Sequence, residues 1–132
     1  MKLLRNVLYL DALVWAVTGI LLALWPVSLL EKVFEQAPLA DYVWVRMAAI
    51  LGIGMAMLMV LVAHRVETLW WFAWAFVLTE GAQALLSALN ALGGLPKGSE
   101  ALLWWLFAGV SAAFALALLA GVAKAGIERP PA

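Results

Sequence analysis

The sequence predicts an all-α integral membrane protein: an antiparallel bundle of four helices that forms a single transmembrane domain over residues 1–132. The first observation is composition, because 67% of residues are hydrophobic and only 12% are charged. Soluble domains carry about 45–50% apolar and about 25% charged residues. The second is that four apolar segments each reach the roughly 20 residues that cross about 30 Å of hydrocarbon. We therefore expect the lipid bilayer to surround most of the chain.

The four predicted helices cover residues 4–25, 42–63, 69–92 and 101–123. Pro26 ends the first, because proline lacks a backbone donor and disfavours a helical residue before it. The first helix begins like a signal peptide, but Asp11 interrupts its apolar run and no small-x-small cleavage site follows, so we expect it to be retained. The short connection 64–68 requires antiparallel neighbours on either side. Residues 93–100 predict a turn, with Ser99 or Glu100 opening the last helix, and residues 127–132 a disordered tail.

The segment between the first two helices predicts a short helix, over residues 29–36, that lies in the membrane interface. Ser28 and Glu31 have the spacing of a capping box, which satisfies free amides at a helix start. One face of this segment is apolar, and Pro38 closes it.

Aromatic and basic residues set the depth and direction of the helices. One predicted interface holds Trp25, Tyr42, Trp44, Trp104 and Trp105. The opposite interface holds Tyr9, Trp70, Trp71 and Trp74. The side with both termini carries Lys2, Arg5, Arg65, Lys124 and Arg129. The other side carries Lys32, Arg46 and Lys97. Because basic residues favour the cytoplasmic side, we expect both termini in the cytoplasm.

A polar stripe on the third predicted helix is the strongest candidate for a functional site. Glu80 lies near mid-membrane, and Gln83, Ser87 and Asn90 share its sector at 100° per residue. A charged carboxylate at that depth is costly unless it is paired, protonated or hydrated. In the functional interpretation, Glu80 couples a ligand or a proton at the bottom of an outward-facing cleft, with Arg46 nearby. In the alternative, a protonated or ion-paired Glu80 only fixes helix packing. We expect Glu80 to be protonated or linked to water and not directly paired with Arg46.

A second polar group suggests a structural contact between helices. Arg46 and His64 share one face of the second helix, five turns apart. Depth allows Asp11 to meet His64 or Arg65 as a structural polar pair. The alternative is that Arg46 and Arg65 extend to the headgroups while His64 caps a helix end.

Small residues mark candidate packing faces on two predicted helices, because they let helix backbones approach closely in lipid. On the fourth helix a small residue recurs every four positions, at Gly109, Ala113, Ala117, Gly121 and Ala125. On the second they are Ala48, Gly52 and Ala56. We expect the second stripe to pack within the chain, and the fourth helix to offer a surface for self-association or for another membrane protein.

Several functions are disfavoured by what the sequence lacks. The formal net charge is zero, which argues against a nucleic-acid partner. With no cysteine and one histidine, no metal site or bis-histidine haem site is expected. No nucleophile with a base and an orienting group is apparent, so we expect neither an enzyme nor a cofactor.

The first helix contains Gly19-x5-Trp25-Pro26, and Val45-Arg46-Met47 comes before a second helix that contains Gly52 and Gly54 and ends Ala63-His64-Arg65. In these residues the chain resembles small bacterial membrane proteins with a DoxX-like layout. The resemblance implies a four-helix bundle and assigns no site residue. We expect a non-catalytic accessory or structural subunit of a larger membrane complex. The alternative is a small transporter or binder of an apolar or cationic molecule that uses Glu80 as a coupling carboxylate.

Overall fold

The computed structural model describes residues 1–129, and their regular elements are all helical. Three long helices are α1 (Lys2–Leu24), α2 (Val43–His64) and α5 (Leu102–Glu128). A fourth rod runs continuously over Val66–Gly94. It comprises α3 (Val66–Leu69), η2 (Trp70–Phe72), α4 (Ala73–Leu89) and η3 (Asn90–Gly94). All four rods are long and apolar enough to cross a membrane, which confirms the predicted four-helix, all-α class.

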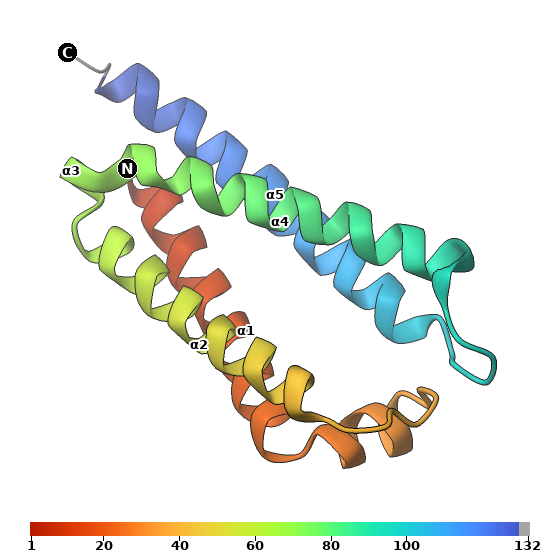
Figure 1. Ribbon diagram of the computed structural model, residues 1–132. Coiled ribbons are helices and arrows are strands. Elements are labelled where there is room, and N and C mark those ends of the chain that lie inside the picture. The colour runs from red at the N-terminus through yellow and green to blue at the C-terminus, as the bar shows by residue number, and fades with distance from the viewer. Residues whose placement is uncertain (130–132) are drawn as a thin grey trace.

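The helices form two antiparallel hairpins, α1 with α2 and α4 with α5 (Figure 1). The hairpins pack together mainly through α1 and α5, whereas α2 and α4 contact each other only marginally. The apolar core lies toward the end where both termini are found. Its largest buried side chains include Leu4, Leu8, Met59, Val66, Leu118 and Val122. Large apolar side chains also cover the outside, such as Leu51 at 74% exposure and Leu78 at 70%, as expected of a surface in contact with lipid.

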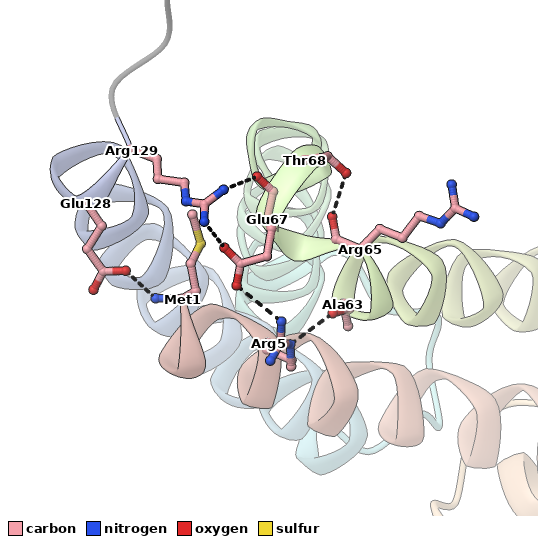
Figure 2. A network of polar contacts seen from close by, with 8 residues as sticks. All are labelled: Met1, Arg5, Ala63, Arg65, Glu67, Thr68, Glu128 and Arg129. Carbon is pink, nitrogen blue, oxygen red and sulfur yellow. Dashed lines mark hydrogen bonds and ion pairs between the residues drawn. The ribbon is translucent and has the colours of Figure 1, made fainter.

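Ion pairs join the helices at the end with the termini (Figure 2). The Met1 amino group lies 2.5 Å from Glu128, so the two ends of the described chain meet. Glu67, on α3, accepts Arg5 of α1 at 3.4 Å and Arg129, after α5, at 3.1 Å. These contacts join α1, α3 and α5 at one face of the bundle.

Hydrogen bonds between the two connecting segments close the opposite end. Gln36 donates to the Glu100 carbonyl at 2.7 Å and accepts the Trp104 indole N–H at 3.0 Å. The Ala37 amide donates to the Ser99 hydroxyl at 2.9 Å. The connection after α1 therefore packs on the turn before α5. Ion pairs join the helices at one end of the bundle, and these hydrogen bonds join them at the other.

The interfacial segment differs from its prediction. It forms one π-helical stretch, η1 (Ser28–Val33), whose N-cap is Val27 and which has no side-chain cap. The predicted capping box of Ser28 and Glu31 is therefore wrong. Glu31 instead accepts a hydrogen bond from the Tyr42 hydroxyl. This bond raises the pKa of Tyr42, because the neutral phenol donates it and the phenolate cannot.

Two helix boundaries are also corrected. Only Arg65 separates α2 from α3, because its backbone (φ −114°, ψ 36°) breaks the helix and the next one begins at once. At the other end α5 continues to Glu128, so the predicted disorder is wrong for Ile127 and Glu128. Ser99 does not cap α5, because its hydroxyl accepts from Ala37. The rest of the predicted tail, residues 130–132, lies outside the described residues.

Candidate small-molecule site between the two hairpins

A cavity of about 790 Å³ lies between the α1/α2 and α4/α5 hairpins. Its volume falls within the roughly 300–1,000 Å³ range of small-molecule sites in proteins. All four long rods and both closing segments contribute to its wall, which is mostly apolar. Its aromatic side chains are Trp15, Phe34, Tyr42, Trp104, Phe107 and Phe114. The polar groups are few, and two of them are carboxyl groups.

These two carboxyl groups, Asp11 of α1 and Glu80 of α4, lie beside each other in the cavity wall. Asp11 is 0% exposed and Glu80 is 2% exposed. The Trp15 indole N–H donates a hydrogen bond to Glu80 Oε1, and the Ser111 hydroxyl also lies beside Glu80. Neither oxygen of an ionised Asp11 has a hydrogen-bond donor within residues 1–129, although the two carboxyl groups lie close enough to share a hydrogen bond when one of them is protonated. The pair therefore brings two acids into the apolar interior with too few donors to satisfy them.

The charge of this pair has no cationic partner in the cavity. In the described chain, no lysine, arginine or histidine contributes to the wall. The nearest basic residue before Asp11 on α1 is Arg5. Arg5 lies at the end of the bundle, where it contacts Glu67. Since an isolated buried carboxylate is costly, the site favours either protonated acids or a bound cation.

Glycines determine how closely α1 and α2 approach at the cavity. A Cβ atom at Gly19 would lie 2.8 Å from the Ala49 carbonyl oxygen, closer than real contacts allow. A Cβ at Gly52 would lie 3.1 Å from the Trp15 ring. Trp15 follows Asp11 by one helical turn, so both side chains project from the same face of α1. Gly52 thus provides the space in which the indole is held against Glu80.

The structure divides the predicted polar stripe of α4. Gln83 lines the cavity with Glu80, as the angular count predicted. Ser87 is buried but does not line the cavity. Asn90 begins η3, and its side-chain oxygen lies 2.9 Å from where a Cβ of Gly94 would be. Arg46 is exposed and lies outside the cavity wall, so it is not a cation for Glu80.

The predicted pairing of Asp11 with His64 is not formed. Arg5 Nε donates to the Ala63 carbonyl at 3.3 Å, which places residue 63 at the depth of residue 5. Asp11 is six residues further along α1, about 9 Å deeper at 1.5 Å per residue. His64 is exposed at the end of α2. The prediction placed Asp11 too near the membrane surface.

The small-residue stripes pack partly within the chain. On α2, Gly52 and Ala56 are buried, whereas Ala48 is exposed at the cavity. On α5, Gly109 and Ala113 are exposed, Ala117 is half-buried, and Gly121 and Ala125 are buried. A Cβ at Gly121 would lie 3.1 Å from Leu4 Cα. The stripe changes face because a four-residue step drifts by about 40° on a helix of 3.6 residues per turn.

Residues 1–129 contain no group of three side chains that could hold a metal ion. Comparisons with protein-family models, curated proteins and solved structures found no match. The fold and the cavity therefore define the class: a four-helix, multi-pass membrane protein with an acid pair in its interior.

Proposed function

We propose that this protein binds a small apolar or cationic molecule inside the membrane, as a binder or carrier, with Glu80 as its coupling carboxylate. One observation carries the proposal: two buried carboxyl groups, Asp11 and Glu80, in the wall of a cavity of about 790 Å³. Ligand sites combine an apolar wall with a few convergent polar groups in this way. An acid pair used only for packing would not require an open volume beside it.

Access is proposed to be lateral. Both ends of the bundle are tied, one by the ion pairs of Glu67 and the other by the hydrogen bonds of Gln36. In contrast, α2 and α4 contact each other only marginally. A molecule dissolved in the lipid would thus reach the cavity between these two helices.

The test compares two neighbouring substitutions on α1. Thr18→Trp places an indole in the cavity wall, whereas Val17→Trp places it on the 47% exposed lipid side. Phenylbutanol and phenylbutylamine serve as probes, and binding is read as a rise in unfolding temperature of the purified protein in a neutral detergent. We expect at least one probe to stabilise the wild type and Val17→Trp, and to stabilise Thr18→Trp much less. Equal stabilisation of all three proteins, or of none, would contradict a site in this cavity.

The accessory-subunit role stays a prediction and is the second candidate. The exposed Gly109 and Ala113 on α5 support it, because they leave a part of the lipid-facing surface where another helix could approach closely. Mild-detergent purification tests it, since a stoichiometric larger complex is expected for a subunit and not for a separate binder.

The bacterial inner membrane, with both termini in the cytoplasm, is also proposed. The excess of Lys and Arg at the end with the termini supports this orientation. Arg5, Arg65 and Arg129 all lie at this end of the bundle (Figure 2).

A further inference from the structure

As a carboxylate, Asp11 would be the most costly unpartnered group in the part of the chain that the structure describes. Its side chain is fully buried and contributes to the wall of the cavity, and its oxygens meet no donor except a proton shared with Glu80. Buried polar atoms nearly always have hydrogen-bond partners, and a buried acceptor without a donor destabilises the protein. A group that enters the cavity and donates hydrogen bonds would remove this cost.

The remaining features of the cavity restrict what that group can be. Glu80 keeps a donor from Trp15, so the pair offers more acceptors than the protein satisfies. No basic side chain lines the wall, so a positive charge meets no repulsion, while an anion would face two acids. Trp15, Phe107 and Phe114 line the cavity, and aromatic side chains can both attract a cation and bury an apolar body.

We propose, building on the function proposed above, that the ligand is an apolar molecule with one protonated amine, whose ammonium group lies between Asp11 and Glu80 and replaces one proton of the pair. An ammonium group supplies up to three donors and one charge. It can thus donate to both oxygens of Asp11 and to Glu80 together.

The release of one proton on amine binding follows because a site of low dielectric constant favours zero net charge. With an empty cavity, two protons keep the acid pair neutral. With a monocation bound, the site is again neutral only if one carboxyl group is ionised, so one proton leaves to water. The groups that touch the pair from α1 and α5, the Trp15 indole and the Ser111 hydroxyl, do not exchange protons near neutral pH. Tyr42, toward the opposite end of the cavity, is the other titratable residue in its wall.

Two measurable consequences follow. Each bound amine releases one proton, and amine affinity rises by about tenfold per pH unit while the pair holds both protons. A neutral molecule of the same shape binds without proton release and without this pH dependence.

The experiment uses phenylbutylamine, phenylbutanol and phenylbutyrate, which share one apolar body and differ in their polar group. The full-length protein in a neutral detergent is titrated by calorimetry in two buffers of different ionisation enthalpy, which yields the number of protons released. We expect the amine to bind tightest and to release one proton, the alcohol to bind more weakly with none, and the carboxylate not to bind. The double variant Asp11→Asn/Glu80→Gln should lose amine binding and keep alcohol binding. Glu100→Gln, the same isosteric change at an exposed position, should behave as wild type.

The outcomes separate the two proposals. Alcohol binding to the wild type, without preference for the amine or without proton release, would overturn the amine inference and leave the binding function standing. If neither the alcohol nor the amine binds the wild type, both proposals fail. The wild-type comparison needs no variant, so the test remains decisive even if the double variant does not fold.

Discussion

The indole N–H of Trp15 on α1 donates a hydrogen bond to Glu80 Oε1 on α4, so this contact joins the two hairpins beside the cavity. Trp15→Phe keeps an aromatic ring there and removes the donor. We expect the free energy of unfolding to fall by about 1–3 kcal/mol, because Glu80 then loses the Trp15 donor in the apolar interior. Trp71→Phe is the control, since Trp71 is 54% exposed. Equal effects of the two changes on unfolding in a denaturing detergent would contradict this role of Trp15.

Gly52 and Gly54 form a matched pair on α2. A Cβ at Gly52 would lie 3.1 Å from the Trp15 ring, whereas a Cβ at Gly54 has no neighbour within 4 Å. Gly52→Val should displace the indole and destabilise the protein by about 1–3 kcal/mol, as overpacking does. Gly54→Val should leave stability nearly unchanged. Thermal unfolding of the two variants measures the difference, and a larger loss for Gly54→Val would refute the packing argument.

A second matched pair lies on α5 and separates folding from association. Gly121→Leu should destabilise the monomer, because a Cβ there meets Leu4 Cα at 3.1 Å. Gly109→Leu should leave folding intact, because no neighbour lies within 4 Å of its Cβ position. If the exposed face of α5 binds another chain, Gly109→Leu also reduces the mass of the complex in mild-detergent sizing. A folded, unchanged Gly121→Leu protein would contradict the contact with α1.

The orientation is tested by cysteines, because the chain contains none of its own. We expect Lys97→Cys to react with a membrane-impermeant thiol reagent on intact cells, and Ile127→Cys, at an 83% exposed position, to react only after lysis. The reverse pattern would place both termini outside.

Much of the fold could be predicted because the bilayer imposes a length on each span. Four apolar runs of about 20 residues leave few alternatives, and the short connection at residues 64–68 forces antiparallel neighbours. The sequence predicts a disordered tail from Ile127 onward, whereas α5 continues to Glu128. Its contact with the Met1 amino group joins residues from the two ends of the chain, and local sequence patterns carry no signal for such contacts.

The site was predicted in part for a similar reason. The depth of Glu80 and the angle of Gln83 follow from a single helix, and both residues line the cavity. The partner of Glu80 depends on the relative shift of two helices, which periodicity does not give, so the sequence alone predicts that Asp11 meets His64 or Arg65. One signal was available: Trp15 follows Asp11 by one turn, and an indole beside a carboxyl group indicates a polar face directed inward.

The central claim is that Asp11 and Glu80 form a protonated acid pair that binds a cation. Infrared difference spectroscopy of the protein with and without phenylbutylamine tests it most directly, because protonated and ionised carboxyl groups absorb in separate bands. We expect a carboxylic-acid band in the free protein that partly converts to a carboxylate band when the amine binds. Glu80→Gln should weaken the acid band with little loss of stability, because the amide is nearly isosteric with the neutral acid, and Asp11→Asn/Glu80→Gln should abolish it. A free protein without any carboxylic-acid band, or a band that the amine leaves unchanged, would contradict the account.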